Sequence, residues 1–419
     1  MEIWCTISEE DFNQKIRFQK RAFVCSFVVP SLLKYIKFHL LNRNKESEKE
    51  DPDSWQPYKS ALFILRNLSY ISENEVYSSI YELIGDNLTN NDSRIKQSVI
   101  LAFGTILNKR FKANLSSNIK DIIESFFTIF LNDESSQVRF AIIWVFKKIM
   151  QKIPESILEL DPQLRTIFTQ GLLQFLDLNN MKTNIKIIDQ TCKFFDFYIE
   201  KECQYVKEST GSSVFPTSIL SNSYSNIISY LISIALNAVK TKSGLVDCSF
   251  SLMSSLTKFA PNDTEIFFED IFPNLVDLLN QTTGDNFNEE NEIKLEIQEN
   301  ICTVISHIIA YERLQLDVPK SKYLYELVKK MFLIRRGLFC GGISLCTSLA
   351  IYLKSEFIEF SDDYLNFLNI AMRDIDNKMI CSSGLNSLSE LIRSLGNQIN
   401  NYMDELFPLI NAICNVIHI

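Results

Sequence analysis

Apolar residues recur along this chain at the three- and four-residue spacing of amphipathic α-helices. In SWQPYKSALFILRNLSYI, residues 54–71, one helical face carries Ala61, Leu62, Leu65 and Leu68. Similar segments follow after short polar breaks, at residues 75–88, 90–107, 116–131, 132–154 and 162–178. The pattern predicts antiparallel pairs of helices joined by short polar turns.

The helix pairs recur with a regular period. Their first helices are predicted to begin near Asp53, Asp92, Asp133, Met181, Gly244, Glu292, Arg336 and Asp376. Most steps between these starts are about 40 residues, which is the period of HEAT and armadillo arrays. We therefore predict an all-α fold, a HEAT-repeat (armadillo-like) right-handed superhelical solenoid. It would occupy residues 1–419 as one domain of about eight to ten antiparallel helix pairs.

The helix starts carry the residues that such arrays use. Asp92 and Asp133 stand where a helix N-terminus needs a cap, and Arg94 and Arg139 follow them. HEAT repeats commonly place Asp and Arg at these positions, so we expect a polar ladder between successive repeats. The chain holds 31 Phe against 15 Tyr and 3 Trp, which suits apolar seams between packed helix layers.

Two polar segments, residues 201–223 and 280–292, interrupt the period. Both are rich in Ser, Asn, Gly and Thr, so they are interpreted as surface loops between helices. Elsewhere helix breakers are rare, with 11 Gly and 10 Pro in 419 residues, which indicates long helices. The stretch TGSS at 210–213 has no lysine partner and follows no strand, so no phosphate site is expected there.

The formal net charge of −9 argues against nucleic acid as the main partner and favours basic partners. The ten cysteines include no C-x-x-C pair, so we expect buried free thiols in a reducing compartment rather than zinc or redox sites. The most apolar stretch, residues 337–353, is short for a membrane span and contains three Gly. The N-terminus has no apolar core of signal-peptide type. A soluble intracellular protein without membrane insertion is predicted.

No catalytic constellation is visible. The three histidines, His39, His307 and His418, lie far apart in apolar helical stretches, where structural roles are the usual ones. Metalloprotease, hydrolase and kinase motifs are absent from the sequence. We therefore expect no metal, no cofactor and no enzymatic activity, and expect binding through the inner surface of the solenoid.

One acidic segment, ESEKEDPDSWQP at residues 46–57, has two interpretations. Its carboxylates are Glu46, Glu48, Glu50, Asp51 and Asp53. They form either a solvated connector or an electrostatic contact for a basic partner, because a row of like charges attracts opposite charge through its summed field. Trp55 either packs under the helix start at Pro57 or stacks on a side chain of the partner.

Several stretches together resemble the importin β family. They are EIWCTISEED (2–11), FVVPSLLKYIKFHL (27–40), EKEDPDSWQPYKSALFIL (48–65), ILAFGTILNKR (100–110), VRFAIIWVFKKIMQKIPES (138–156) and SGLNSLSELIRSLGNQI (383–399). Their order and spacing follow those of the family along almost the whole chain. The resemblance implies that the chain corresponds to the middle repeats, without the N-terminal and last repeats of the family.

The resemblance also implies a function, that of a nuclear transport receptor in protein import. Such a receptor binds the basic segment of an importin α-type adaptor, or a basic cargo, on its inner face. It releases this partner when it binds Ran in the GTP form, and it contacts phenylalanine-glycine nucleoporins. It is found in the cytoplasm and nucleus and at the nuclear pore and envelope. Only part of the Ran site would lie in this chain. The alternative is a HEAT scaffold or phosphatase-regulatory-type subunit without Ran dependence.

The site residues implied by the resemblance are the acidic segment and three aromatic residues. The acidic segment contacts both adaptor and Ran in the family. Trp144 aligns with a tryptophan that contacts the basic helix of the adaptor, although a core position is the alternative. The tryptophan of the next repeat is replaced by Lys193, with Phe194 beside it, and Phe140 stands where the family has Asp. We therefore predict Trp55, Trp144 and Phe194 as aromatic partner contacts, with adaptor binding weakened by Lys193.

Overall fold

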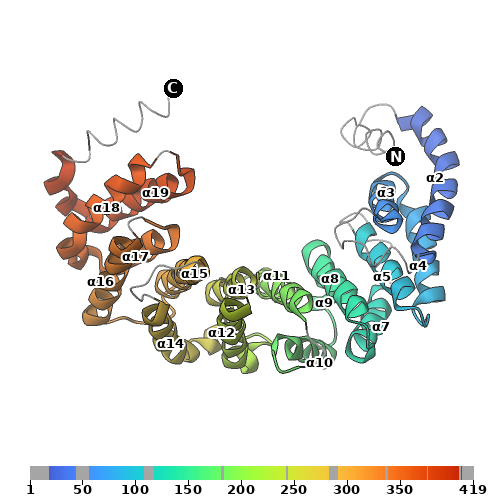
Figure 1. The fold of residues 1–419 in the computed structure, drawn as a ribbon, viewed down its shortest axis with the longest axis horizontal. Helices are drawn as coiled ribbons and strands as arrows, with labels where there is room; N and C mark the ends of the chain where they lie inside the picture. Colours follow the sequence, from blue (N-terminus) through green and yellow to red (C-terminus); the bar gives the residue numbers. More distant parts are fainter. Residues whose placement is uncertain are drawn as a thin grey trace. The chain divides into compact units, whose positions relative to one another are not determined.

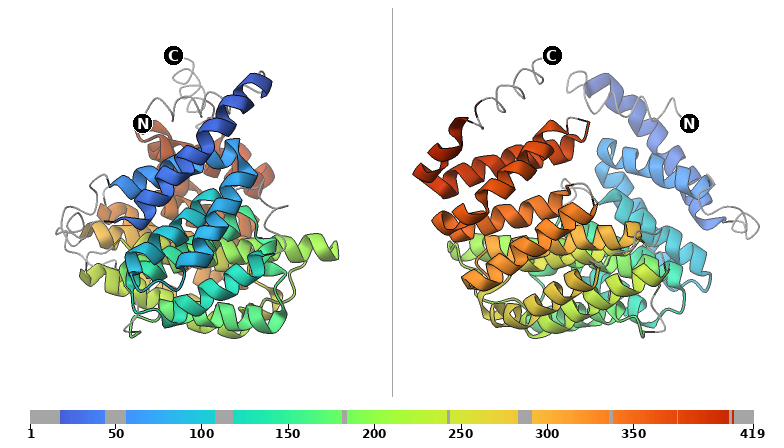
Figure 2. Two further views of the ribbon diagram at one scale, coloured as in Figure 1. Left: turned by 90° about the vertical axis from the view of Figure 1, so that its right-hand side faces the viewer. Right: turned by 60° about the vertical axis from the view of Figure 1, so that its left-hand side comes forward.

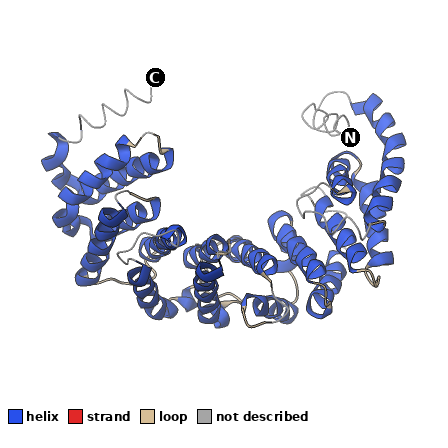
Figure 3. Cartoon of the chain, in the orientation of Figure 1, coloured by secondary structure: helices blue, strands red, loops and turns tan. Residues whose placement is uncertain are grey.

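The computed structural model describes residues 18–43, 56–107, 118–180, 184–241, 244–282, 291–335, 338–374, 376–404 and 407. Within these ranges the regular elements are α-helices and short 3-10 helices, and no strand occurs (Figure 3). The chain divides into two compact units, residues 1–205 (unit 1) and 206–419 (unit 2). The boundary falls inside the long helix α11 (Ile185–Thr210).

Unit 1 consists of two layers of helices (Figure 1). Its first-helix layer contains α2 (Phe18–Leu41), α4 (Glu73–Asn87), α7 (Ile119–Asn132) and α10 (Pro162–Leu173). Its second-helix layer contains α3 (Pro57–Ile71), α5 (Ser93–Ile106), α8 (Ser136–Lys152) and α11. The short helices α9 (Glu155–Leu158) and η3 (Gln174–Leu176) lie in the connections. Each of α3, α5 and α8 packs on the helix before it in the chain, and α5 packs between α3 and α8.

Unit 2 repeats this arrangement. Its first helices are α12 (Tyr224–Thr241), α14 (Ile266–Thr282), α16 (Val318–Arg335) and α18 (Ser361–Arg373). Its second helices are α13 (Val246–Lys258), α15 (Asn291–Ala310), α17 (Cys340–Leu353) and α19 (Lys378–Leu395). The 3-10 helices are η4 (Ser221–Ser223), η5 (Asn262–Thr264), η6 (Lys354–Phe360) and η7 (Gly396–Tyr402). Helix α17 packs on both α15 and α19, and the orange to red part of the chain that contains them comes forward in the right-hand view of Figure 2.

Aromatic side chains join the layers of unit 1. The ring of Phe168 on α10 lies 5.0 Å from Phe127 on α7, 4.9 Å from Phe146 on α8 and 5.9 Å from Phe194 on α11, between centroids. Offset and edge-to-face contacts at such distances are favourable for aromatic pairs. The prediction that phenylalanines form the seams between layers is confirmed here.

The polar ladder predicted between successive repeats is present, although its members differ in part. Asp92 caps α5 by accepting from the backbone N–H of Arg94 at 2.9 Å. Asp133 pairs with Lys96 of the preceding second helix, which links α5 to the start of α8. The predicted cap at Asp133 is wrong, because Ser135 is the N-cap of α8 and accepts from the backbone N–H of Val138.

Two further predictions need correction. The predicted first helices are α3, α5, α8, α11, α13, α15, α17 and α19, which are the second members of their pairs. A repeat period does not specify which helix of a pair comes first, since only the tertiary contacts distinguish the two.

The predicted loop at 201–223 is also shorter than expected, because α11 continues to Thr210. Glu202 and Cys203 are buried on α11, and their packing stabilises the helix beyond the predicted start of the loop.

Candidate partner-binding surfaces

Metal and membrane sites find no support in the described parts of the chain. No group of three or more His, Cys, Asp or Glu side chains that could hold a metal ion occurs among the described residues. No helix in these ranges has the length and apolar character needed to cross a bilayer. The expected buried thiols are confirmed for Cys192, Cys203, Cys248, Cys302 and Cys346.

The acidic segment lies outside the described residues, as does Trp55, so the structure does not test either of them. The residues that flank the segment are described. Arg43 follows α2, and its guanidinium lies 4.1 Å from the centre of the Tyr58 ring on α3. Pro57 occupies the first turn of α3, where its fixed φ favours helix initiation.

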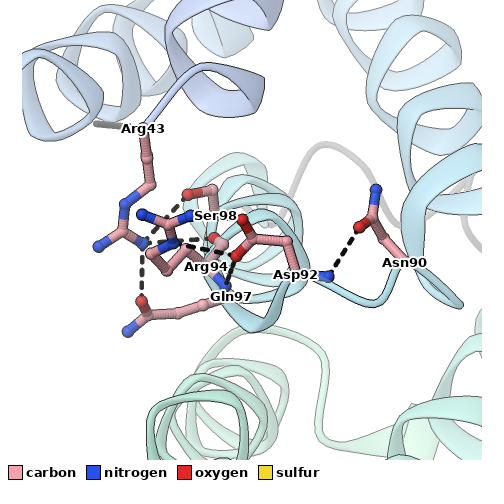
Figure 4. A network of polar contacts seen from close by, with 6 residues as sticks. All are labelled: Arg43, Asn90, Asp92, Arg94, Gln97 and Ser98. Atoms are coloured by element: carbon pink, nitrogen blue, oxygen red, sulfur yellow. Dashed lines mark hydrogen bonds and ion pairs between the residues drawn. The ribbon is translucent and has the colours of Figure 1, made fainter. Parts of the chain in front are cut away.

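Arg43 also ties the end of α2 to α5 (Figure 4). Its Nη1 donates to the carbonyl of Arg94, to Oε1 of Gln97 at 2.7 Å and to Oγ of Ser98. Asp92 in turn holds the Arg94 side chain through contacts of 3.0 and 2.5 Å. Arg43, the last described residue before the acidic segment, is therefore anchored beside the start of α5.

Trp144 lies on the second-helix layer of unit 1 and is half-buried. It packs against the position on α5 where Gly104 has no side chain. A Cβ at Gly104 would lie 2.4 Å from Cζ3 of Trp144, so the two helices approach closely here. Nζ of Lys148 lies 5.6 Å from the centre of the indole ring, within the range of a cation–π contact. Trp144 thus packs between helices, as the core interpretation expects, while its accessible surface leaves the partner contact a prediction.

Two lysines, Lys147 and Lys148, follow Trp144 by one turn of α8. Nζ of Lys147 donates to Oε1 of Gln190 on α11 at 2.5 Å. Burial and the neighbouring charges of Lys148 and Lys193 lower the pKa of Lys147 to about 8, against the opposing effect of Asp189. Burial, together with the charges of Lys152 and Arg66, also lowers the pKa of Lys148. The surface beside Trp144 is therefore electropositive, and positive charge is under mutual repulsion there.

The predicted partner contact at Phe194 is wrong. Phe194 is fully buried and contacts Phe168, Phe195 and Tyr198 inside unit 1. The neighbouring Lys193 faces the solvent instead and pairs with Asp189 at 2.8 Å. Adjacent residues on a helix point about 100° apart, so only one of these two side chains reaches the surface.

Two grooves lie between successive first helices, one in each unit. The groove between α2 and α4 has a volume of about 470 Å³ and is lined by Pro30, Leu33, Lys34, Lys37, Glu75 and Ser79. The groove between α14 and α16 has a volume of about 420 Å³, and its apolar lining includes Phe272, Pro273, Val276, Leu314 and Leu324. One lining residue of each groove is a proline inside a helix, Pro30 in α2 and Pro273 in α14. A proline inside a helix removes a backbone donor and bends the helix.

A pair of carboxylates joins α13 to α15 in unit 2. Glu296 on α15 shares a hydrogen bond with Asp247 in the first turn of α13. Burial, this hydrogen bond and the charges of Asp247 and Glu299 raise the pKa of Glu296 to about 7. The pair therefore couples the packing of α13 on α15 to the protonation of Glu296.

Two layers of antiparallel helix pairs with grooves between their first helices define a binding protein of the HEAT-repeat type. The family model described as importin subunit beta-1-like, TPR repeats, matches residues 172–417. This match covers more than half of the chain, which therefore belongs to the importin subunit beta-1-like family. Importins act in transport rather than catalysis, in agreement with the prediction that the chain is not an enzyme.

Relatives and solved structures agree with this assignment. Importin subunit beta-1 of Saccharomyces cerevisiae is 21% identical over 422 residues, which cover 98% of this chain and 46% of that protein. The structure of yeast importin-β, Kap95p, matches with a TM-score of 0.78 at 19% identity, over 99% of this chain and 47% of that one. The chain thus spans about half the length of the curated relatives that it matches.

Two further structures of Kap95 contain partners. A Kap95:Nup1 complex matches with a TM-score of 0.76 at 19% identity, over 98% of this chain and 46% of that one. A structure of Kap95p with RanGDP matches with a TM-score of 0.74 at 20% identity, over 99% of this chain and 48% of that one. At such identities the likeness shows that the fold is shared.

Sequence reasoning missed the two grooves and the Asp247–Glu296 pair. The prolines within apolar helical patterns, Pro30 and Pro273, were a visible signal for the grooves. No comparable signal existed for the carboxylate pair, because Asp247 and Glu296 are brought together only by the packing of α13 on α15.

Proposed function

We propose that this chain is part of a nuclear transport receptor of the importin β type, which carries a basic adaptor or cargo into the nucleus. Membership of the family supports this proposal over a scaffold without Ran dependence. The observation that carries it is the pair of grooves between first helices, because they offer a way of contacting the nuclear pore.

The grooves suit the phenylalanine rings of phenylalanine-glycine nucleoporins. In the α14–α16 groove, Phe272 and Leu324 are buried while Val276 is partly exposed, so an inserted ring meets apolar surface. Such a groove holds one flexible aromatic side chain weakly, which suits repeated capture and release. The Kap95 complex with Nup1 shows that a protein of this fold binds a nucleoporin.

The transported partner would be basic. In this proposal the carboxylates Glu48, Glu50, Asp51 and Asp53 attract a Lys/Arg-rich segment, such as that of an importin α-type adaptor. Release would follow the binding of Ran in its GTP form, and Kap95p with RanGDP is a precedent for Ran contact within this fold. The acidic segment continues from Arg43, which is anchored on α5, so a charge contact here would be coupled to the solenoid.

The groove is tested with Val276→Asp, which places a charge on the apolar surface between α14 and α16. We expect this variant to lose binding to an immobilised phenylalanine-glycine repeat, because the inserted ring would desolvate the new carboxylate. Ile266→Asp is the matched control, since Ile266 is 68% exposed on the same helix and lies outside the groove. Equal binding by both variants and the parent chain would contradict a role for the groove.

The basic partner is tested separately with a labelled Lys/Arg-rich adaptor peptide. Neutralising Glu48, Glu50, Asp51 and Asp53 to their amides is expected to abolish its salt-sensitive binding. The control is a chain with Asp270→Asn and Asp362→Asn, two exposed carboxylates on first helices of unit 2. Binding that ignores the acidic segment, or that Ran-GTP does not reverse, would rule out this part of the mechanism.

A further inference from the structure

Three successive second helices of unit 1 carry basic residues alone among their charged side chains. The second helices α3, α5 and α8 contain no Asp or Glu. Their basic residues are Lys59, Arg66, Arg94, Lys96, Arg139, Lys147, Lys148 and Lys152. The neighbouring first helix α4 shows the opposite balance, with four acidic residues and no Lys or Arg. A partner that approaches α3, α5 and α8 therefore meets positive charge from three successive second helices.

Part of this charge is used inside the unit. Lys96 pairs with Asp133, Arg94 pairs with Asp92, and Arg139 donates to the carbonyl of Asp133. These contacts lie near the N-terminal ends of α5 and α8 and belong to the ladder between repeats. The C-terminal halves of α3 and α8 carry a further set of basic residues.

Another group of cations lies near the C-terminal end of α8, where the charge of Lys193 acts on Lys147 and that of Arg66 acts on Lys148. Lys147, Lys148 and Lys152 lie on the last turns of α8, Arg66 on α3 and Lys193 on α11. None of Arg66, Lys148 and Lys152 forms an ion pair with a carboxylate among the described residues. Lys193 pairs with Asp189, and Lys147 is held by the neutral amide of Gln190. Asp189 is thus the carboxylate that pairs with one of these five cations among the described residues, and the five cations together with Trp144 are called the basic face.

We propose that the basic face binds an acidic, Asp/Glu-rich segment of a partner protein in an extended conformation. The inference goes beyond the proposed nuclear transport function, because it concerns a second partner of opposite charge. It also assigns the region around Trp144 to that acidic partner, since the lysines there would repel a basic helix. The acidic segment at residues 46–57 and the carboxylates of unit 2 stay available for a basic partner.

Charge complementarity determines this choice of partner. Burial and the charges of Lys152 and Arg66 lower the pKa of Lys148, so these cations repel one another, and an anionic ligand offsets that repulsion. Trp144 adds an apolar surface that the methylene groups of a Glu side chain or an apolar neighbour can cover. Four helices spaced about 10 Å apart span about 30 Å, which an extended segment of about nine residues covers.

The test measures binding of a fluorescein-labelled Asp/Glu peptide of about nine residues to the full chain by fluorescence anisotropy. We expect binding at low salt that weakens as salt is raised, because exposed charges are screened. The double variant Lys148→Gln, Lys152→Gln should weaken peptide binding about tenfold, since the attraction of two lysines for the peptide is lost. Thermal unfolding by circular dichroism verifies that the variant is folded.

A matched control separates the basic face from general charge. Lys330→Gln with Lys378→Gln removes the same charge from exposed positions of unit 2, and its peptide affinity should equal that of the parent chain. A change in tryptophan emission on peptide addition should disappear in Trp144→Phe, which places the peptide beside the indole.

Three results would overturn the inference. The first is an absence of peptide binding at low salt. The second is an equal loss of affinity in the two double variants. The third is tighter binding of a single-stranded RNA oligonucleotide through Lys148 and Lys152, which would make the basic face a nucleic-acid site. Loss of nucleoporin binding in the groove variant affects none of these measurements, so the two proposals fail independently.

Discussion

At the scale of single residues, the contact between Gly104 and Trp144 determines how α5 and α8 meet. A Cβ on Gly104 would approach Cζ3 of Trp144 to 2.4 Å and Cγ2 of Val145 to 2.8 Å. The absence of a side chain therefore leaves room for the indole between α5 and α8. Trp144 could be selected from the sequence as a candidate site residue, but its partner Gly104 could not, because the two are 40 positions apart.

This contact predicts the effect of Gly104→Ala. The added methyl group overpacks the seam, so we expect the free energy of unfolding to fall by about 1–3 kcal/mol. Gly85→Ala on α4 is the control, because a Cβ there has nothing within 4 Å. It should stabilise the chain by about 0.5–1 kcal/mol through the better helix propensity of Ala. Thermal unfolding followed by circular dichroism compares the variants, and a gain in stability for both would refute the contact.

At the scale of elements, the packing of α13 on α15 brings two carboxylates together. Neither Asp247 nor Glu296 stands out in its own helix, where each is one acidic residue on a polar face. Their hydrogen bond exists only because the second helices stack. The pair therefore makes the stability of unit 2 depend on pH.

The direction of this dependence follows from the raised pKa of Glu296. The folded chain holds the proton up to about pH 7, whereas the unfolded chain releases it near the usual glutamate pKa of 4.5. The folded state therefore binds more protons in this interval, and stability falls as the pH rises from about 5 through about 7. Glu296→Gln keeps a neutral hydrogen-bonding group and should remove this part of the decline.

Unfolding midpoints measured from about pH 5 to about pH 8 test this prediction, and the difference between parent and variant isolates Glu296. Glu326→Gln on α16 controls for the loss of one exposed negative charge. A parent chain that gains stability relative to Glu296→Gln over this interval would show that the pair is not formed.

At the scale of the whole molecule, the chain consists of two compact units, each with its own buried core. In repeat proteins each repeat contacts mainly its neighbours, so destabilisation spreads over short distances. A local defect in one unit should therefore raise the opening of that unit while the other keeps its protection.

Hydrogen exchange in two variants tests this independence. Gly104→Ala should raise exchange in peptides from α5 and α8. Gly341→Ala should raise it in α15 and α17, because a Cβ at Gly341 would lie 2.2 Å from the carbonyl oxygen of Glu299. Each variant serves as the control for the other. Faster exchange throughout the chain in both would instead indicate one cooperative unit.

The sequence by itself determined the helices, their period of about 40 residues and the ladder residues at their starts. It could do so because apolar spacing and capping are local signals, as Ala61, Leu65 and Leu68 show by being buried where the pattern placed them. The family resemblance rested on the same local stretches and was confirmed by the family match.

Only the tertiary structure decided which faces are available to partners. Phe194 and Lys193 are neighbours in the sequence, yet the packing of α11 on α10 buries the first and exposes the second. The contact of α8 with α11 likewise brought Lys193 close to Lys147, and the packing of α13 on α15 placed Asp247 beside Glu296. Binding surfaces are formed by residues from different helices, and the positions of those helices depend on contacts that no local pattern in the sequence records.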